Sequence, residues 1–406
     1  MSPSQDIRTP GVYVDEITAR IQPINGVPTS TAAFVGPTLR GPTGTVPDLL
    51  TSFAQFEALY GDVSNLNFPG LSAQSIPNYM ALAVRAFFEN GGQQLYVARV
   101  IAAKEGTPPA ADDYRNALGT LEGLDDVSIV AAPGSTVFGG DTGAHPTPGQ
   151  AAPIYAELIA HVSRPGVYRF AVLDPPPECS TSDIQAIRSQ IDSTNAALYY
   201  PWVLIANSQV NLEAPAQITV PPSGFICGIY ARVDAQRGVF KAPANEVLLG
   251  AIGFERTISD SEANMLNGLG INCLRSFPGQ GNLVWGARTT SSDPEWKYVN
   301  IRRYLTYLER SIDSGTQWVV FEPNDPILWA SVTERINNFL TAEWRKGALV
   351  GTKPSDAFFV RCDSSTMTQD DIDNGRLICM IGVAPIRPAE FVIFRIGKFT
   401  ASSETL

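Results

Sequence analysis

The chain has 406 residues, of which 44% are hydrophobic, and a formal net charge of −11 at pH 7. This length favours two or three domains, and the acidic balance argues against nucleic acid as a main partner, because affinity for phosphate backbones depends on basic surface. The five cysteines are scattered and odd in number, and the first residues lack a basic start followed by an apolar stretch. We therefore expect reduced thiols in a cytoplasm, and no direct membrane insertion, since no run of about 18 apolar residues occurs.

The first predicted element falls at residues 9–17, TPGVYVDEI, where a turn signal precedes the strand-forming residues Val12, Tyr13 and Val14. A strand needs a pairing partner, and the neighbouring sequence offers no hairpin that would supply one. Proline-punctuated sequence follows up to residue 28. We therefore predict an N-terminal strand arm, residues 1–27, whose partner lies elsewhere.

Residues 28–282 predict an α/β body, because short apolar strands alternate there with amphipathic helices, as in domains with a mainly parallel sheet. The predicted strands are residues 31–35, 94–101, 127–132, 168–173 and 197–206. The predicted helices are residues 52–60, 76–90, 155–162 and 184–191. The low-complexity segment 138–153, FGGDTGAHPTPGQAAP, is expected to be an exposed and variable loop.

A second module is predicted over residues 283–384. Its expected elements are a helix at 298–312 and strands at 317–321, 357–362 and 377–383. Between them, Asp325 as N-cap and Pro326 in the first turn predict a longer helix that runs to Lys346 and ends before Gly347. The glycine-rich segment 279–288 lacks the frame of a dinucleotide site and is interpreted as a connector.

Residues 385–406 form a second predicted strand arm. Its most strand-like stretch consists of Phe391, Val392, Ile393, Phe394, Arg395 and Ile396. Basic residues interrupt this apolar stretch, as charges often do in edge strands. Two strand-like ends therefore flank one folded body.

No catalytic or metal-binding motif is present: the chain has two histidines and no CxxC, HExxH, P-loop or G-x-S-x-G sequence. A Ser-His-Asp triad would have to use His161, at the end of a predicted helix, and Asp174, after a predicted strand. A surface histidine and a strand-end aspartate are the simpler interpretation. The acidic pairs at 112–113, 125–126 and 370–371 are expected to be helix caps or solvated loop residues and not an acid/base pair. We therefore expect no enzyme activity, no metal and no cofactor.

Six segments carry motifs in a specific order. They are 293–312 (DPEWKYVNIRRYLTYLERSI), 317–329 (QWVVFEPNDPILW), 339–351 (FLTAEWRKGALVG), 357–363 (AFFVRCD), 370–377 (DDIDNGRL) and 381–394 (IGVAPIRPAEFVIF). Together with 221–245, 271–289 and the opening TPGVYVDEI, they resemble the tail sheath proteins of contractile phages and related contractile injection systems. The resemblance covers most of the chain and is weakest at about 105–165.

This resemblance implies a subtilisin-like α/β body and a C-terminal α+β sheath domain, with extended β-strand arms at both termini. It implies a structural subunit that polymerises by strand exchange into a helical contractile sleeve of stacked hexameric rings around an inner tube. Contraction then drives the tube through a target envelope. The implied partners are other copies of the chain, an inner tube protein, and baseplate and terminal cap proteins. The implied setting is assembly in a bacterial cytoplasm, as part of a phage tail or contractile injection particle.

In this family, arms of neighbouring subunits add to a small sheet on a third subunit, and the two strand-like ends suit that exchange. The alternative is that each arm pairs within its own subunit. We also expect the helix 326–346 to face the inner tube, with Glu334, Arg335, Arg345 and Lys346 pointing outward; an ordinary solvated helix face is the alternative. Two other functions remain open, a non-contractile cap or baseplate component and a hydrolase that uses His161 as its base.

Overall fold

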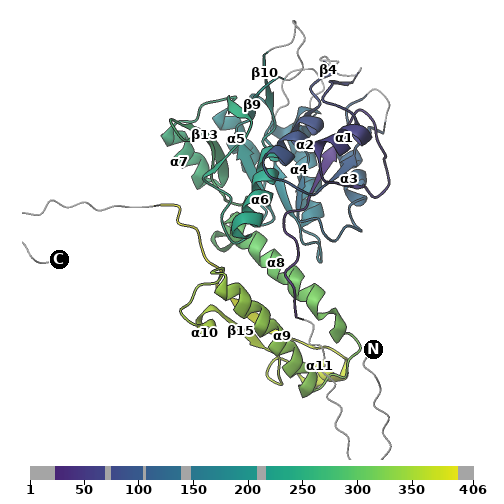
Figure 1. Cartoon of the computed structure of the whole chain (residues 1–406), viewed down its shortest axis with the longest axis vertical. Coiled ribbons are helices and arrows are strands. Elements are labelled where there is room, and N and C mark those ends of the chain that lie inside the picture. The colour runs from purple at the N-terminus through teal and green to yellow at the C-terminus, as the bar shows by residue number, and fades with distance from the viewer. Residues whose placement is uncertain (1–22, 69–74, 104–106, 139–147, 208–215, 392–406) are drawn as a thin grey trace, which may run out of the picture.

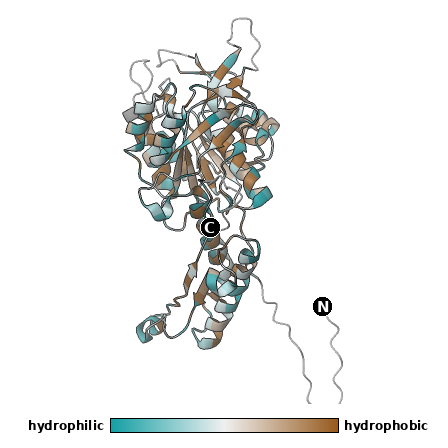
Figure 2. Cartoon of the chain, turned by 90° about the vertical axis from the view of Figure 1, so that its left-hand side faces the viewer, coloured by the Kyte–Doolittle hydropathy of each residue, from teal (hydrophilic) through white to brown (hydrophobic). Residues whose placement is uncertain are grey.

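The structure is a computed structural model of the chain, and it describes residues 23–68, 75–103, 107–138, 148–207 and 216–391. An α/β body carries helices α1 to α7, and a smaller module carries α9 to α11 (Figure 1). Helix α8 extends from the body along this smaller module. The strands of the body are mostly hydrophobic, whereas hydrophilic residues gather on the outer helices (Figure 2).

A nine-stranded sheet forms the centre of the body, in the order β11-β14-β13-β8-β7-β6-β1-β5-β2. Its strands are β1 (Ala32–Gly36), β2 (Leu49–Leu50), β5 (Leu95–Arg99), β6 (Ile129–Ala131), β7 (Phe170–Leu173), β8 (Ala196–Tyr200), β11 (Glu246–Val247), β13 (Ile271–Phe277) and β14 (Gly281–Trp285). The six strands from β13 to β5 run parallel, and the antiparallel strands lie at the two ends. The predicted, mainly parallel α/β sheet is therefore confirmed.

Helices cover both faces of this sheet, which explains why its strands are apolar on both sides. One face packs against α1 (Phe53–Tyr60), α2 (Tyr79–Glu89) and α6 (Ser223–Arg237). The other face packs against α3 (Ala111–Gly119), α4 (Pro148–Val162), α5 (Thr181–Arg188) and α7 (Asp260–Gly268). The alternation is visible in β1, where Phe34 belongs to the first core and Val35 to the second.

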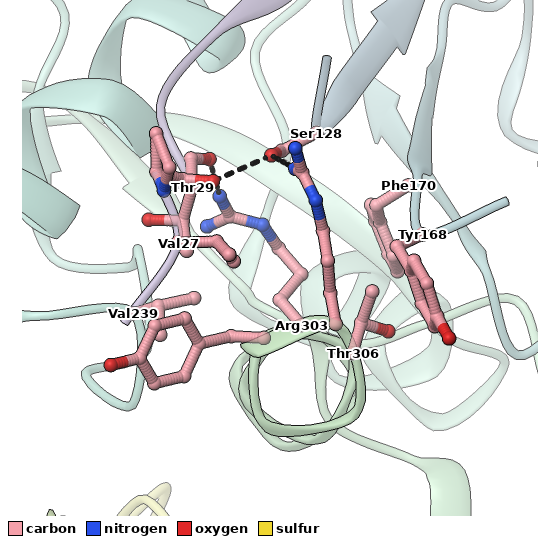
Figure 3. Close-up of a pocket in the computed structure, with 11 residues that line it drawn as sticks. Val27, Thr29, Ser128, Tyr168, Phe170, Val239, Arg303 and Thr306 are labelled. Atoms are coloured by element: carbon pink, nitrogen blue, oxygen red, sulfur yellow. Dashed lines mark hydrogen bonds between the residues drawn. The ribbon is translucent and has the colours of Figure 1, made fainter. Parts of the chain in front are cut away.

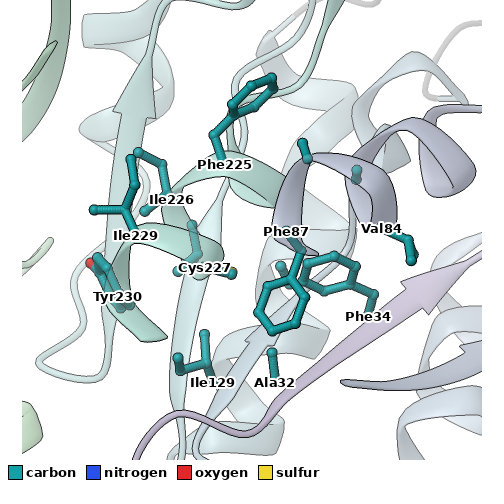
Figure 4. Close-up of a cluster of buried hydrophobic side chains, with 14 of the residues drawn as sticks. Ala32, Phe34, Val84, Phe87, Ile129, Phe225, Ile226, Cys227, Ile229 and Tyr230 are labelled. Carbon is teal, nitrogen blue, oxygen red and sulfur yellow. The ribbon is translucent and has the colours of Figure 1, made fainter. Parts of the chain in front are cut away.

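Helices α2 and α6 pack closely at the first face (Figure 4). Phe87 of α2 lies edge-on to Phe34 of the sheet, with ring centroids 5.6 Å apart. A Cβ at Gly228 of α6 would lie 2.5 Å from the carbonyl oxygen of Phe87. Glycine at this position is therefore what allows the two helix backbones to approach.

The segment predicted as one strand at 197–206 is two strands in different sheets, so that prediction was wrong. After β8, β9 (Val203–Ala206) lies between β10 (Gln217–Val220) and β12 (Ala251–Phe254) in a separate three-stranded sheet. Pro201 stands between the two strands and has no amide hydrogen with which to continue a ladder. A further short pair, β3 (Leu66–Asn67) and β4 (Ser75–Ile76), completes the strands of the body.

The smaller module packs α8 (Val299–Thr316) and α9 (Pro326–Arg345) around a third core. Its other elements are α10 (Pro354–Ala357), β15 (Phe358–Arg361), α11 (Gln369–Asp373) and β16 (Met380–Val383). Helix α9 begins as predicted, because the Asp325 side chain accepts a hydrogen bond of 2.8 Å from the Leu328 amide. It also ends as predicted, since Gly347 adopts a φ of 79°. One stripe of α9 is buried, and it consists of Trp329, Val332, Ile336, Phe339 and Leu340.

The strand predicted at 317–321 does not form. Helix α8 continues into a 3₁₀ turn, η3 (Gln317–Val319), whose Trp318 and Val319 pack against the third core. Phe321 then has a φ of 70°, outside the extended region, and its side chain is fully exposed. The β-rich composition of QWVVF indicated a strand, but no neighbouring strand edge is available to pair with it among the described residues.

Two segments predicted as irregular contain regular structure among their described residues. The connector predicted at 279–288 contains β14, which forms a hairpin with β13. The predicted boundary at 282/283 therefore falls inside a strand of the nine-stranded sheet. The end of the loop predicted at 138–153 is the first part of α4, while a short 3₁₀ turn, η1 (Ser135–Phe138), precedes that loop. The segment 138–153 is rich in glycine and proline, which are typical of loops, and for this reason the sequence did not predict the start of α4.

Candidate assembly surfaces

The residues of the hypothetical hydrolase triad do not come together. Asp174 follows β7 as expected, but its carboxylate accepts hydrogen bonds from the Ser223 amide at 2.7 Å and the Ser223 hydroxyl at 2.6 Å. Burial raises the pKa of Asp174 to about 7. The carboxylate thus caps the N-terminus of α6 instead of orienting a histidine.

His161 is buried, with 5% of its surface exposed, so the prediction of a surface histidine was wrong. Arg164 Nη2 lies 2.9 Å from its Nδ1, and Arg169 Nη1 lies 2.6 Å from its Nε2. Burial, followed by these two arginines, lowers the pKa of His161 to about 4. The imidazole is therefore neutral at pH 7 and sequestered from solvent. Arg169 reaches it from beside β7, a contact that the sequence pattern does not indicate.

The acidic pairs at 112–113 and 370–371 are helix caps, as predicted. Asp113 accepts a hydrogen bond of 2.8 Å from the Ala110 amide at the start of α3, and Asp371 accepts one of 2.9 Å from the Thr368 amide at the start of α11. Within the described residues, no group of three or more acidic, histidine or cysteine side chains is placed to hold a metal ion. None of the helices in the described ranges is both long enough and apolar enough to cross a membrane.

Helix α9 presents a polar surface opposite its buried stripe. Glu334, Arg345 and Lys346 are exposed, and Lys346 Nζ lies 2.6 Å from the buried carboxylate of Glu343. Arg335 is half-buried because its guanidinium lies 3.8 Å from the ring centroid of Trp318. Of the four side chains expected to point outward, Arg335 therefore has a packing role within the module.

A broad, open hollow lies beside the same helix. It is bounded by one face of α9 and by the residues that follow β15, and its lining includes Trp329, Thr333, Glu334, Asn337, Cys362 and Asp363. The hollow combines an indole and a thiol with amide and carboxylate groups. It is too open to enclose a small molecule, and it is suited to contact with another chain.

The two-stranded sheet β15–β16 has unpaired edges. Its strands run antiparallel, with Phe359 opposite Gly382 and Arg361 opposite Met380. Within the described part of the chain, each strand has one ladder partner, so one edge of each carries backbone groups without a strand beside it. Phe359 and Met380 are both 51% exposed on the outward face. A small sheet of this kind accepts an added strand readily.

The first described residues lie against α8. The Val27 amide donates to the Ser311 hydroxyl at 3.1 Å. Arg303 donates to the Thr29 carbonyl at 2.9 Å (Figure 3). Arg303 also forms a buried ion pair of 2.7 Å with Asp234 of α6, so it is a structural residue. The cavity beside these groups has a volume of about 20 Å³, room for one water molecule and no ligand.

Most of the predicted arm residues lie outside the described ranges. These are Val12, Tyr13, Val14, Val392, Ile393, Phe394, Arg395 and Ile396. Phe391 is the last described residue, and it is 70% exposed. The two ends of the described chain therefore leave from different places, one along α8 and the other near the junction of the two modules (Figure 1).

The open edge of β15–β16, the polar face of α9 and the hollow beside it are surfaces suited to contact with other protein chains. Comparisons with known proteins agree. Residues 109–290 match the family described as phage tail sheath protein central domain, and residues 291–397 match the phage tail sheath C-terminal domain. The chain belongs to the contractile tail sheath family.

Individual relatives support this assignment. A putative prophage major tail sheath protein of Pseudomonas aeruginosa (strain UCBPP-PA14) is 25% identical over 232 residues, which are 56% of this chain and 57% of that protein. The tail sheath protein of Burkholderia phage BcepMu is 32% identical over 180 residues, 41% of this chain and 36% of that protein. These matches therefore span about a third to somewhat over half of the relatives' own lengths.

Solved structures match nearly the whole chain. The sheath complex of an extracellular contractile injection system, PVC, in the contracted state is 30% identical, with a TM-score of 0.74, and 97% of this chain and 98% of that chain are covered. The helical sheath of the anti-feeding prophage (AFP) in the contracted state is 29% identical, with a TM-score of 0.75 and coverages of 97% and 99%. The mixed α/β fold is thus that of sheath proteins.

Proposed function

We propose that this chain is the repeating subunit of a contractile sheath, a structural protein that polymerises into a helical sleeve of stacked hexameric rings around an inner tube. Contraction of the sleeve drives the tube through a target envelope. The observation that carries this proposal is the match, over 97% of the chain and at 30% identity, to a sheath complex in the contracted state. The proposed function needs no cofactor and no catalysis.

Strand exchange is the proposed link between subunits. The unpaired edges of β15–β16 and the exposed side chains of Phe359 and Met380 offer a receiving surface. The strand-forming ends at 12–14 and 391–396 would supply the added strands from neighbouring subunits. Backbone hydrogen bonds then hold the arms, and alternating side chains set their register.

For one arm, the free energy gained by burying its side chains nearly equals the free energy spent on ordering its backbone. Burying five or six large side chains of the C-terminal arm contributes roughly 10 kcal/mol, at about 1.5–3 kcal/mol each. Ordering about ten backbone residues costs a similar amount, at about 1–2 kcal/mol per residue. The lattice therefore depends on many linked contacts. This balance suits a lattice whose bodies shift during contraction while the arms act as hinges.

The exposed face of α9 is the proposed contact with the inner tube. Glu334, Arg345 and Lys346 are exposed there, and single exposed charge pairs contribute only about 0–1 kcal/mol each. Weak contacts suit a sheath that must release the tube when it contracts. Arg335 is left out of this surface because it packs on Trp318.

The finer features of the fold belong to the same proposal. The parallel sheet with helices on both faces is consistent with a subtilisin-like body, and buried His161 together with Asp174 capping α6 favours a body without protease activity. Baseplate and terminal cap proteins are the further proposed partners. The proposed setting is assembly in a bacterial cytoplasm, as part of a phage tail or injection particle.

A baseplate component is the second candidate. A chain of the AFP baseplate is 29% identical, with a TM-score of 0.72 and 97% of this chain covered. Copy number distinguishes the two functions: a sheath subunit is present in many rings per particle, whereas a baseplate component is confined to one end.

Electron microscopy tests the proposal. We expect the full chain, co-expressed with its tube protein, to form long striated sleeves. A chain that lacks residues 392–406 should remain folded by circular dichroism, because it keeps Glu390 and its bonds to Arg288, but it should form no sleeve. Sleeves from the truncated chain would contradict the role of the C-terminal arm, and their absence from the full chain would contradict the proposed function itself.

A further inference from the structure

A cluster of charges holds the chain just before the C-terminal arm begins. Glu390 accepts two hydrogen bonds from the Arg288 guanidinium, at 2.7 Å from Nε and 2.6 Å from Nη2. The Tyr298 hydroxyl donates to it at 3.1 Å, and Lys297 Nζ lies 3.3 Å away. The side chains of Arg288 and Glu390 are 9% and 17% exposed. Paired, charge-assisted bonds in a mostly buried site are strong and directional.

The receiving side of this cluster is rigidly attached to the large sheet. The Arg288 amide donates to Asn272 Oδ1 at 2.7 Å, and Asn272 Nδ2 donates to the Arg288 carbonyl at 2.8 Å. Asn272 is fully buried on β13. Arg288 Nη1 also donates to the Asn267 carbonyl at 2.6 Å. Arg288 is thus fixed in position independently of Glu390, so that it forms a preorganised socket for the carboxylate.

The chain before Glu390 is attached to the smaller module. The Val350 amide donates to the Ala384 carbonyl at 2.8 Å, and the Ile386 amide donates to the Ala348 carbonyl at 3.1 Å. Only residues 387–389 separate this attachment from Glu390. Directly beyond Glu390, Phe391 is 70% exposed. The C-terminal arm therefore leaves the molecule from a point that is fastened to the nine-stranded sheet, not from the end of β16.

We propose that Glu390 is a positioning residue for strand exchange: it fixes where the C-terminal arm leaves the subunit and passes tension in that arm to the nine-stranded sheet. Without it, a pull on the arm acts first on the backbone bonds of Ile386 and Ala384 to residues 348–350, and then on β16, whose ladder with β15 spans four residue pairs. With it, the same pull acts first on the bonds to Arg288 and Tyr298. This inference rests on the proposed function, because the tension comes from arms shared between subunits.

The first test uses the isolated, full-length subunit and chymotrypsin cleavage after Phe391. We expect Glu390→Ala to accelerate this cleavage at least tenfold, because the neighbouring backbone is released. Glu390→Gln keeps an acceptor for Arg288 and should give an intermediate rate. Glu295→Ala is the matched control, since it removes an equal charge from an exposed side chain two residues before Lys297. Equal rates in the Glu390→Ala and Glu295→Ala variants would overturn the inference, whether or not sleeves form.

The second test compares sleeves made from the same variants. We expect the Glu390→Ala subunit to keep a melting temperature within a few degrees of the Glu295→Ala control, while its sleeves are several-fold shorter and break during contraction. Sleeves of normal length and contraction from the Glu390→Ala chain would overturn the positioning role. A wild-type chain that makes no sleeve contradicts the proposed function instead, and the cleavage comparison then decides by itself whether Glu390 holds the arm.

Discussion

The ion pair between Asp234 of α6 and Arg303 of α8 joins the body to the helix that carries the smaller module. The two donor–acceptor distances are 3.0 and 2.7 Å, and each side chain is 3% exposed. The Thr29 hydroxyl donates to the same carboxylate at 2.7 Å. Asp234→Asn removes the negative charge and leaves a buried guanidinium without a counter-ion. We expect the free energy of unfolding to fall by about 3–5 kcal/mol.

A double replacement, measured by urea unfolding, tests whether the loss of stability comes from leaving one charge of the pair buried and unpaired. Replacing both members, with Asp234→Leu and Arg303→Met together, leaves no buried charge and should cost less than Asp234→Asn alone. Glu309→Gln is the control, because Glu309 pairs with Arg302 and its side chain is 47% exposed. That change should cost about 0–1 kcal/mol. Equal losses in Asp234→Asn and Glu309→Gln would refute the conclusion that this junction is buried and ionic.

Two further predictions concern the body. Burial raises the pKa of Asp174 to about 7 from its ordinary 3.8, so its contribution to stability is fully present below about pH 4 and is lost as the pH rises to 7; Asp174→Asn should flatten the fall in unfolding free energy between about pH 4 and 7, and an unchanged slope would contradict this. At Gly228, a Cβ would lie 2.5 Å from the Phe87 carbonyl oxygen, whereas at Gly123 nothing lies within 4 Å. Gly228→Ala should therefore cost about 1–3 kcal/mol in denaturant unfolding and Gly123→Ala much less, and equal costs would show that α2 and α6 do not touch there.

The sequence was sufficient where local chemistry alone determines the structure. Helix α9 is the clearest case, because an N-cap at Asp325, a first-turn proline and a stop at Gly347 bracket one apolar stripe. Five of the six parallel strands were also predicted, since a strand covered on both faces is a short apolar run bounded by turn residues, whereas β13 was not predicted.

The sequence was insufficient where a distant residue decides the structure. The segment QWVVF has the composition of a strand. In the described structure, however, Trp318 packs under the guanidinium of Arg335, and no strand lies beside this segment. His161 is buried, and its imidazole contacts Arg169, which lies beside β7 and is not near it in any local sequence pattern. Glu390 and Arg288 are 102 residues apart, so no local pattern connects them.

The arms are a different case, because in the proposed strand exchange the partner of each arm lies in another molecule. The sequence indicates strands at 12–14 and 391–396, but a single chain holds no information about which sheet receives them. Among the described residues, the unpaired edges of β15–β16 are where the proposed partner strands would add. An assembled particle is therefore the proper object for testing this part of the account.

The most direct measurement is a cryo-EM reconstruction of the assembled sleeve at a resolution that allows the backbone to be traced between subunits. The account predicts that residues 9–17 and 391–396 of neighbouring copies lie beside β15 and β16 of a third copy, hydrogen-bonded as added strands. A reconstruction in which each arm folds back onto its own subunit, with the edges of β15–β16 facing solvent, would contradict it.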